Sequence, residues 1–315
     1  MPETSRRGFL SAAGPLTAAA LFSRGASAAG KTKIKICLNT GNIGVRANLM
    51  ESIAMAEKFG FEAVDPSVKE LAALSDTAMS ELLDSLQFKK LVFGSCGQSF
   101  PVGQTEEAYS TFLKDLALTA KTMQRAHIRR MVTWLTPVDN KLTYLQNFHL
   151  HAQRIGQAAP ILGDRGVKLG LEYVAPKTGW TRGKYPFIHT LAEMKELVAE
   201  VGKPNLGYTL DVWHWYNAGD TAADVLTLKN EDIVAVHLND APAGVPVDQQ
   251  VDNRRELPMA TGVIDIGAFL NALNQVGYDG PAAAEPMSAA LRAMPPEEAL
   301  SKTAEAMRKA FALIQ

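Results

Sequence analysis

The chain has 315 residues, of which 47% are hydrophobic and 21% are charged, so it can bury a large core and is neither disordered nor fibrous. Its 32 basic and 33 acidic residues give a formal net charge of -1, which excludes the basic surface of a general nucleic-acid-binding protein. The composition predicts an ordinary soluble globular protein.

The N-terminus carries an export pattern. Residues 5–10 read SRRGFL, a small apolar run continues through Phe22, and residues 26–28 read ASA, which is typical of a cleaved twin-arginine signal. The run is too short and too rich in Gly and Pro to span a bilayer, which needs about 20 apolar residues. We therefore expect residues 1–28 to be removed after passage through the twin-arginine translocon. The mature protein would be periplasmic or otherwise exported, without a stable membrane anchor.

From Lys33 onward, short β-branched or apolar runs alternate with longer stretches of helical period, as in βα units on a parallel sheet. One predicted helix begins with a capping box formed by Thr190 and Glu193, and another begins at Asp265 and ends at Gly277. The predicted strands are 34–39, 63–66, 91–95, 130–135, 168–173, 206–211, 233–239 and 282–286.

Eight such units match the size of a (β/α)8 TIM barrel, typically about 250 residues. A doubly wound sheet would show the same alternation, but the first predicted strand-helix turn, NTGNIG at 39–44, lacks the G-x-G-x-x-G spacing. No linker or low-complexity tract interrupts the chain, so we predict one α/β barrel domain over 29–315. Long connections at 174–187 and 240–262 follow strands, where barrel enzymes place active-site loops.

The chain has two cysteines, Cys37 and Cys96. Cys37 falls in the first predicted strand and Cys96 directly follows the third, and the second strand separates these two strands, whereas a disulfide needs Cα atoms within about 7 Å. We expect two free, buried thiols even in an exported protein.

Four predicted strands close with a polar side chain: Glu172, Asp211, His237 and Glu285. Singly, such a carboxylate is commonly a helix cap or ion-pair partner, and such a histidine is commonly a core residue. Four such residues on successive strands indicate one shared site, at the C-terminal mouth of the predicted barrel. Three carboxylates and an imidazole suit one divalent ion, with Mn²⁺ expected and Mg²⁺, Co²⁺ or Zn²⁺ compatible.

The segments around these residues resemble the xylose-isomerase-like barrel superfamily, in its sugar phosphate isomerase/epimerase branch of ketose 3-epimerases, hydroxypyruvate isomerase and inosose dehydratase. The resemblance is strongest over 169–287, and it implies that all four residues bind the metal, that Glu172 and Glu285 act as acid and base, and that His214 touches the substrate. Many relatives have a Pro-Gly pair where this chain reads LPMA at 257–260. The segments that carry the resemblance read LEY at 171–173, DVWH at 211–214, VHLND at 236–240, TGVID at 261–265 and AEP at 284–286.

Further residues are candidates for binding the substrate. His214 could bond a sugar oxygen or face solvent at a helix start, and the ring of Trp213 could cover a sugar face or pack the rim. Lys177 and Arg255, in the two long loops, could bind a hydroxyl, carboxylate or phosphate group or remain solvated. Asp240 closes the VHLND segment and is the fifth candidate.

The resemblance implies chemistry in which a metal stabilises the enediolate formed from a keto-sugar. Two carboxylates on opposite sides of the reacting carbon can invert it or move a proton to its neighbour. We therefore expect an isomerase or epimerase of a free sugar or keto-sugar, because export argues against an intracellular phosphorylated substrate. A lyase that performs β-elimination on a 3-keto-glycoside or inosose is an alternative within the same site.

Two other function classes share parts of this pattern. An endonuclease of the same superfamily needs further ligands from the earlier strands; the second strand offers Asp65, but the third, LVFGSC, offers no imidazole or carboxylate. A sugar-binding barrel that has lost activity would bind metal without turnover. The resemblance also implies a homodimer or homotetramer, although no segment identifies an interface.

Overall fold

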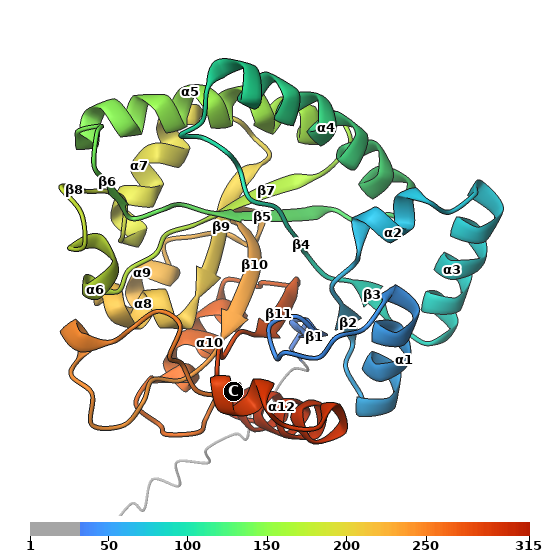
Figure 1. Ribbon diagram of the computed structural model, residues 1–315. Coiled ribbons are helices and arrows are strands. Elements are labelled where there is room, and N and C mark those ends of the chain that lie inside the picture. Colours follow the sequence, from blue (N-terminus) through green and yellow to red (C-terminus); the bar gives the residue numbers. More distant parts are fainter. Residues whose placement is uncertain (1–31) are drawn as a thin grey trace, which may run out of the picture. The chain divides into compact units, whose positions relative to one another are not determined.

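Nine parallel strands form the central sheet, in the order β3-β2-β1-β11-β10-β9-β7-β5-β4 (Figure 1). The computed structural model describes residues 32–315, so the predicted export signal at 1–28 lies outside the described residues. The strands are β1 (Lys35–Leu38), β2 (Ala63–Val64), β3 (Val92–Phe93), β4 (Cys96–Gly97), β5 (Arg130–Trp134), β7 (Lys168–Glu172), β9 (Leu206–Asp211), β10 (Ile233–Leu238) and β11 (Pro281–Ala284).

The two end strands of this sheet, β3 and β4, follow each other in the chain and are separated by Gly94 and Ser95. β3 pairs with β2 and β4 pairs with β5, so this one segment joins both edges of the sheet and closes the barrel. Gly94 is required at the break, because a Cβ there would overlap the Asp65 carboxylate and the Cys37 sulfur. The third of the eight predicted strands is therefore present as two short pieces.

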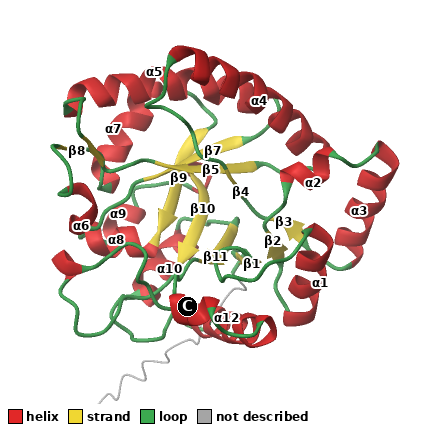
Figure 2. Ribbon diagram, viewed as in Figure 1, coloured by secondary structure: helices red, strands yellow, loops and turns green. Residues whose placement is uncertain are grey.

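Helices cover the outer face of the barrel (Figure 2). Helix α7 begins with the predicted capping box of Thr190 and Glu193, and the Asp265 side chain caps α10. A short antiparallel pair, β6 (Val138–Asp139) with β8 (Tyr185–Pro186), lies outside the barrel sheet. The helices are α1 (Leu49–Phe59), α2 (Val68–Ala72), α3 (Asp76–Phe88), α4 (Glu106–Arg125), α5 (Tyr144–Gly163), α6 (Lys177–Trp180), α7 (Leu191–Val201), α8 (Val212–Ala218), α9 (Ala222–Val225), α10 (Ile266–Gln275), α11 (Ala289–Arg292) and α12 (Pro296–Phe311), with 3-10 turns η1 (Asn230–Asp232) and η2 (Val247–Gln249).

Successive residues of β7 point alternately to the two faces of the sheet. Leu169 and Leu171 of β7 belong to the large core cluster that the strands form with the helices, whereas the alternate position, Gly170, faces the barrel interior. A Cβ at Gly170 would lie 2.5 Å from Thr209 Oγ1 and 2.8 Å from Val234 Cβ. The same alternation points Glu172, the last residue of β7, into the mouth of the barrel.

The predicted fold class and the two predicted free thiols are confirmed over the described residues. The architecture is an α/β TIM barrel, and Cys37 and Cys96 are free and buried. No helix within residues 32–315 combines the length and apolar character that a membrane span requires.

Candidate metal centre

Four neighbouring strands bring together the four side chains that the sequence singles out. Glu172 ends β7, Asp211 ends β9, His237 lies in β10 and Glu285 directly follows β11. In the sheet these strands are adjacent in the order β7-β9-β10-β11, so the two glutamates flank the aspartate and the histidine. Each residue offers one ligand atom, and these atoms all lie within 4.8 Å of one another.

His237 lies at the centre of the cluster. Its Nδ1 is 3.1 Å from Glu172 Oε1, 3.5 Å from Glu285 Oε2 and 4.0 Å from Asp211 Oδ2. Burial alone would lower the pKa of His237, but the charges of Glu285, Glu172 and Asp211 outweigh it and raise the pKa to about 10. Burial raises the pKa of Glu172, which the His237 charge partly offsets. The strong negative field favours a cation at this position.

Asp211 has a separate partner for each oxygen. Its Oδ1 accepts hydrogen bonds from the Trp213 backbone N–H at 2.7 Å, which caps α8, and from Asn239 Nδ2 at 2.9 Å. Its Oδ2 is thereby turned toward the cluster. Sequence reasoning missed Asn239, although its position two residues after His237 places it on the same face of the strand.

Arg255 is the one guanidinium that residues 32–315 bring to the cluster. Its buried Nη1 lies 2.7 Å from Asp211 Oδ2 and 3.0 Å from Glu285 Oε2. Its Nη2 donates to Asp252 Oδ1 at 2.8 Å, and its Cζ lies 5.4 Å from the centre of the Trp213 ring. Burial disfavours the charge, but Asp211, Glu285 and Asp252 together raise the pKa of Arg255.

The donor set fits a divalent metal ion. Three carboxylates face one guanidinium, so when a bound ion displaces the His237 proton, two negative charges in a buried site remain to be balanced. A dication would balance them, and carboxylate oxygens with one imidazole nitrogen are ligands that Mn²⁺, Mg²⁺, Co²⁺ and Zn²⁺ accept. Glu172, Asp211, His237 and Glu285 are the residues that could hold the ion.

His214 lies beside Arg255 and is 2% exposed, so it does not face solvent. Its Nδ1 accepts the Ala175 backbone N–H at 3.2 Å, and its Nε2 lies 3.4 Å from Arg255 Nη2. Burial lowers the pKa of His214 to about 4. The ring is therefore neutral at pH 7.

Three of the predicted substrate-binding residues have side chains that make other contacts. Trp213 is 0% exposed and packs against Arg255, so its ring offers no surface to a sugar. Both Asp240 oxygens accept backbone N–H groups, from Thr261 and Gly262 at Oδ2 and from Ala241 and Ile264 at Oδ1. Asp240 thus fixes the loop that carries Arg255.

Lys177, at the start of α6, is the third of these residues. Its side chain is half exposed, and its Nζ lies 3.8 Å from Asp248 Oδ2 across the loops. It is a solvated loop charge in this structure and makes no ion pair with the cluster.

Trp134 is a residue at the mouth that sequence reasoning missed. It ends β5, pairs in register with Glu172 and is 50% exposed. The available signal is its position at the end of a barrel strand, the criterion that singled out the four polar residues.

Comparisons with known proteins agree with this fold. The family profile described as xylose isomerase-like TIM barrel matches residues 53–310. An inosose isomerase of Halalkalibacterium halodurans is 22% identical over 292 residues, covering 89% of this chain and 99% of that protein. A ketose 3-epimerase of Arthrobacter globiformis is 26% identical over 138 residues, 44% of this chain and 41% of that protein. The solved structure of a xylose isomerase domain protein from Alicyclobacillus acidocaldarius has a TM-score of 0.75 at 28% identity, covering 89% of this chain and 99% of that one.

Proposed function

The chain belongs to the xylose isomerase-like TIM barrel family, and on this basis we propose that it is a divalent-metal-dependent enzyme that isomerises or epimerises a free sugar or keto-sugar. The observation that carries the proposal is the convergence of three carboxylates and one imidazole at the barrel mouth. The relatives named inosose isomerase and ketose 3-epimerase support the substrate class.

Glu172, Asp211, His237 and Glu285 would hold the metal, for which we propose Mn²⁺. When bound, the ion supplies electrostatic stabilisation of the negative charge that develops on the carbonyl oxygen of the substrate. Asn239 and the Trp213 backbone N–H orient Asp211 for this role through its Oδ1.

Glu172 and Glu285 are the proposed acid and base. They lie on the two outer strands of the cluster, so a sugar carbon held between them would meet one carboxyl group on each side. One removes the proton next to the carbonyl group, and the other returns a proton to the opposite face or to the neighbouring carbon. Burial raises the pKa of Glu172 above that of an ordinary carboxyl group, which favours its role as a group that accepts and holds a proton.

Arg255 and His214 are proposed to bind substrate oxygens. Arg255 presents a permanent positive charge beside Glu285, and the neutral His214 ring lies beside Arg255 on the same side of the site. Both side chains are buried and held by their own partners, Asp252 and the Ala175 N–H. They would therefore bind a hydroxyl or carbonyl oxygen with little loss of side-chain entropy.

We also propose that the enzyme acts outside the cytoplasm. The proposal rests on the twin-arginine pattern of residues 5–28. Export of a fusion of residues 1–35 to a reporter protein, and its loss when Arg6 and Arg7 are both replaced by Lys, would test it.

Solvent deuterium exchange tests the proposed reaction. The metal-free protein is reloaded with Mn²⁺ and incubated in D₂O with free ketoses and 3-keto-glycosides, and NMR follows deuterium at the carbon next to the carbonyl group. The proposal predicts incorporation that requires both metal and Glu172. A product that has lost its β-substituent would assign the lyase reaction, whereas no exchange with any metal or sugar would leave a barrel that only binds.

A further inference from the structure

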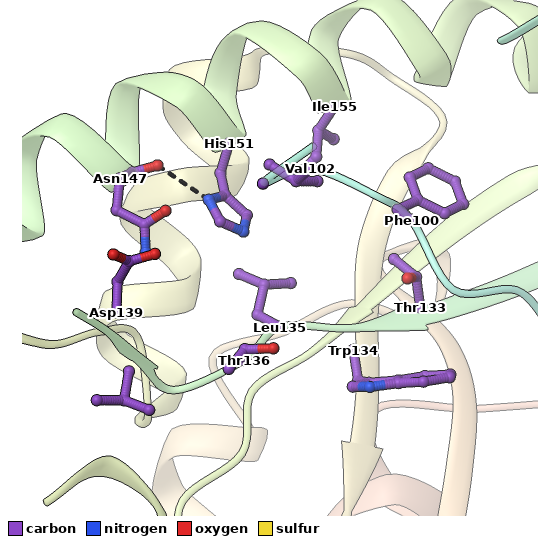
Figure 3. A pocket seen from close by; sticks show the side chains of 12 residues that line it. Phe100, Val102, Thr133, Trp134, Leu135, Thr136, Asp139, Asn147, His151 and Ile155 are labelled. Atoms are coloured by element: carbon purple, nitrogen blue, oxygen red, sulfur yellow. Dashed lines mark hydrogen bonds between the residues drawn. The ribbon is translucent and has the colours of Figure 1, made fainter. Parts of the chain in front are cut away.

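A cavity lies between β5 and helix α5, away from the four metal-centre residues (Figure 3). It has a volume of about 200 Å³ and is bounded by the C-terminal end of β5, helix α5 and the segment after β4. Its apolar wall includes Phe100, Leu135 and Ile155, and its polar side chains include Asp139, Asn147 and His151.

The cavity lies on the outer side of β5 and meets the mouth of the barrel at Trp134, which is one of its lining residues. Trp134 pairs in register with Glu172 and shares its inward face, so its neighbours Thr133 and Leu135 point outward toward the helices. Leu135 belongs to the core cluster formed with the helices. The four metal-centre residues are absent from the lining of the cavity.

Three polar side chains of the cavity keep unused hydrogen-bonding capacity. His151 Nδ1 donates to the Asn147 carbonyl at 2.9 Å (Figure 3), and burial lowers the pKa of His151 to about 4, so its Nε2 is a bare acceptor at pH 7. The Asn147 side chain is buried and lines the cavity, and the bond from His151 engages its backbone carbonyl, which leaves the side-chain amide available. Asp139 uses Oδ1 to accept the N–H groups of Lys141 and Leu142, which leaves Oδ2.

The chemistry of the lining selects the ligand. No lysine or arginine of the described chain lines the cavity, so an anion would find no counter-charge there. Asn147 both donates and accepts, while Asp139 and neutral His151 accept, which matches hydroxyl groups that can do both. The volume is below the roughly 300 to 1,000 Å³ typical of sites for drug-sized ligands, so the ligand is small.

We propose that this cavity binds a small neutral polyhydroxylated molecule, the size of one monosaccharide or cyclitol, at a site separate from the metal centre. The hydroxyl groups would face Asp139, Asn147 and His151, and the C–H face would lie against Phe100 and Ile155.

Calorimetric titration of the full chain with D-glucose, myo-inositol and D-fructose tests this proposal. Ethanolamine and inorganic phosphate serve as charged comparison probes. We expect one of the sugars or the cyclitol to bind in the millimolar range. Asn147→Leu and Asp139→Asn should each weaken that binding about tenfold, the cost of one hydrogen bond to a buried or charged group.

The metal centre supplies the matched control. Asp211→Asn should leave binding at the cavity unchanged, and circular dichroism checks that each variant is folded. Asp139→Asn retains the Oδ1 acceptor, so it tests the site even where Asn147→Leu perturbs packing. The proposal is contradicted if none of the three binds in the millimolar range, if only ethanolamine or phosphate binds, or if Asp211→Asn abolishes binding that both cavity variants retain.

Discussion

The two halves of the barrel both bury carboxylates at the C-terminal ends of their strands, but they treat them differently. Asp65 follows β2, and neutral donors saturate it: Oδ1 accepts from the Ser95 N–H at 2.8 Å and from Cys37 Sγ at 3.3 Å, and Oδ2 accepts from Asn39 Nδ2 at 2.9 Å. Burial raises the pKa of Asp65, and these hydrogen bonds partly offset the rise. A single buried carboxylate surrounded by neutral donors needs no metal.

Across the barrel, Glu172, Asp211 and Glu285 turn oxygens toward one another and toward His237. Their charges raise the pKa of His237, and Arg255 is a second positive partner, which lies at Asp211 and Glu285. Position at a strand end is therefore common to both halves. What distinguishes a metal centre is carboxylates that face each other instead of neutral donors.

The largest expected effect is on catalysis in the metal half, the half of the barrel that carries Glu172, Asp211, His237 and Glu285. Glu285→Gln preserves shape but removes a proton-transferring group, so the rate of deuterium exchange should fall about 1,000-fold, within the range for a lost general acid or base. The thermal midpoint should change little. Fully active Glu285→Gln enzyme would disprove the catalytic assignment.

In the other half of the barrel, the same change of carboxylate to amide should lower the stability of the protein and leave its catalytic activity intact. Asp65→Asn offers one acceptor where Asn39, Ser95 and Cys37 present donors, so the free energy of unfolding should fall by about 2 kcal/mol. Exchange activity of the folded protein should persist. Urea unfolding measures the first effect, and an unchanged stability would show that this network is not structural.

A smaller effect is expected from His151, outside both halves. Its pKa falls from an ordinary 6.5 to about 4 on folding, so between these values the unfolded chain binds a proton that the folded chain does not. Stability should therefore decline as the pH falls from 6.5 to 4. His151→Gln should abolish about 2 kcal/mol of that decline. Urea unfolding at pH 7 and pH 4.5 compares the two proteins, and equal pH dependence would contradict the assignment.

The smallest effect concerns Arg255, the cation already present in the metal half. Arg255→Gln removes a positive charge 2.7 Å from Asp211 Oδ2, so the metal-free protein should bind Mn²⁺ about tenfold more tightly, because a competing charge is gone. Calorimetry measures the affinity. Weaker binding would instead make Arg255 a positioning residue for the metal ligands.

The parallel barrel and its metal-half residues were predictable because both follow from local patterns. Alternating strand residues and parallel strand ends direct Glu172, Asp211 and His237 to one face of the mouth. The role of Asp240 was not predictable, since its oxygens accept N–H groups from Thr261 and Ile264, more than twenty residues away. Contacts of this kind depend on how a long loop closes, and no short sequence pattern records that.

Other features depend on tertiary packing in the same way. The break at Gly94 arises from the Asp65 and Cys37 side chains of neighbouring strands, and the burial of Trp213 arises from the loop that brings Arg255 over its ring. An aromatic residue after a strand end reads the same in sequence whether its ring is exposed or covered.

Metal stoichiometry of the purified protein tests the central claim most directly. After removal of bound metal, titration with Mn²⁺ should show one ion per chain for the wild type and for Asp65→Asn. Asp211→Asn should lose at least 100-fold in affinity while remaining folded by circular dichroism, because it replaces a buried ligand that Asn239 and Trp213 hold in place. Equal metal binding by Asp211→Asn and the wild type would contradict the assignment of the metal half.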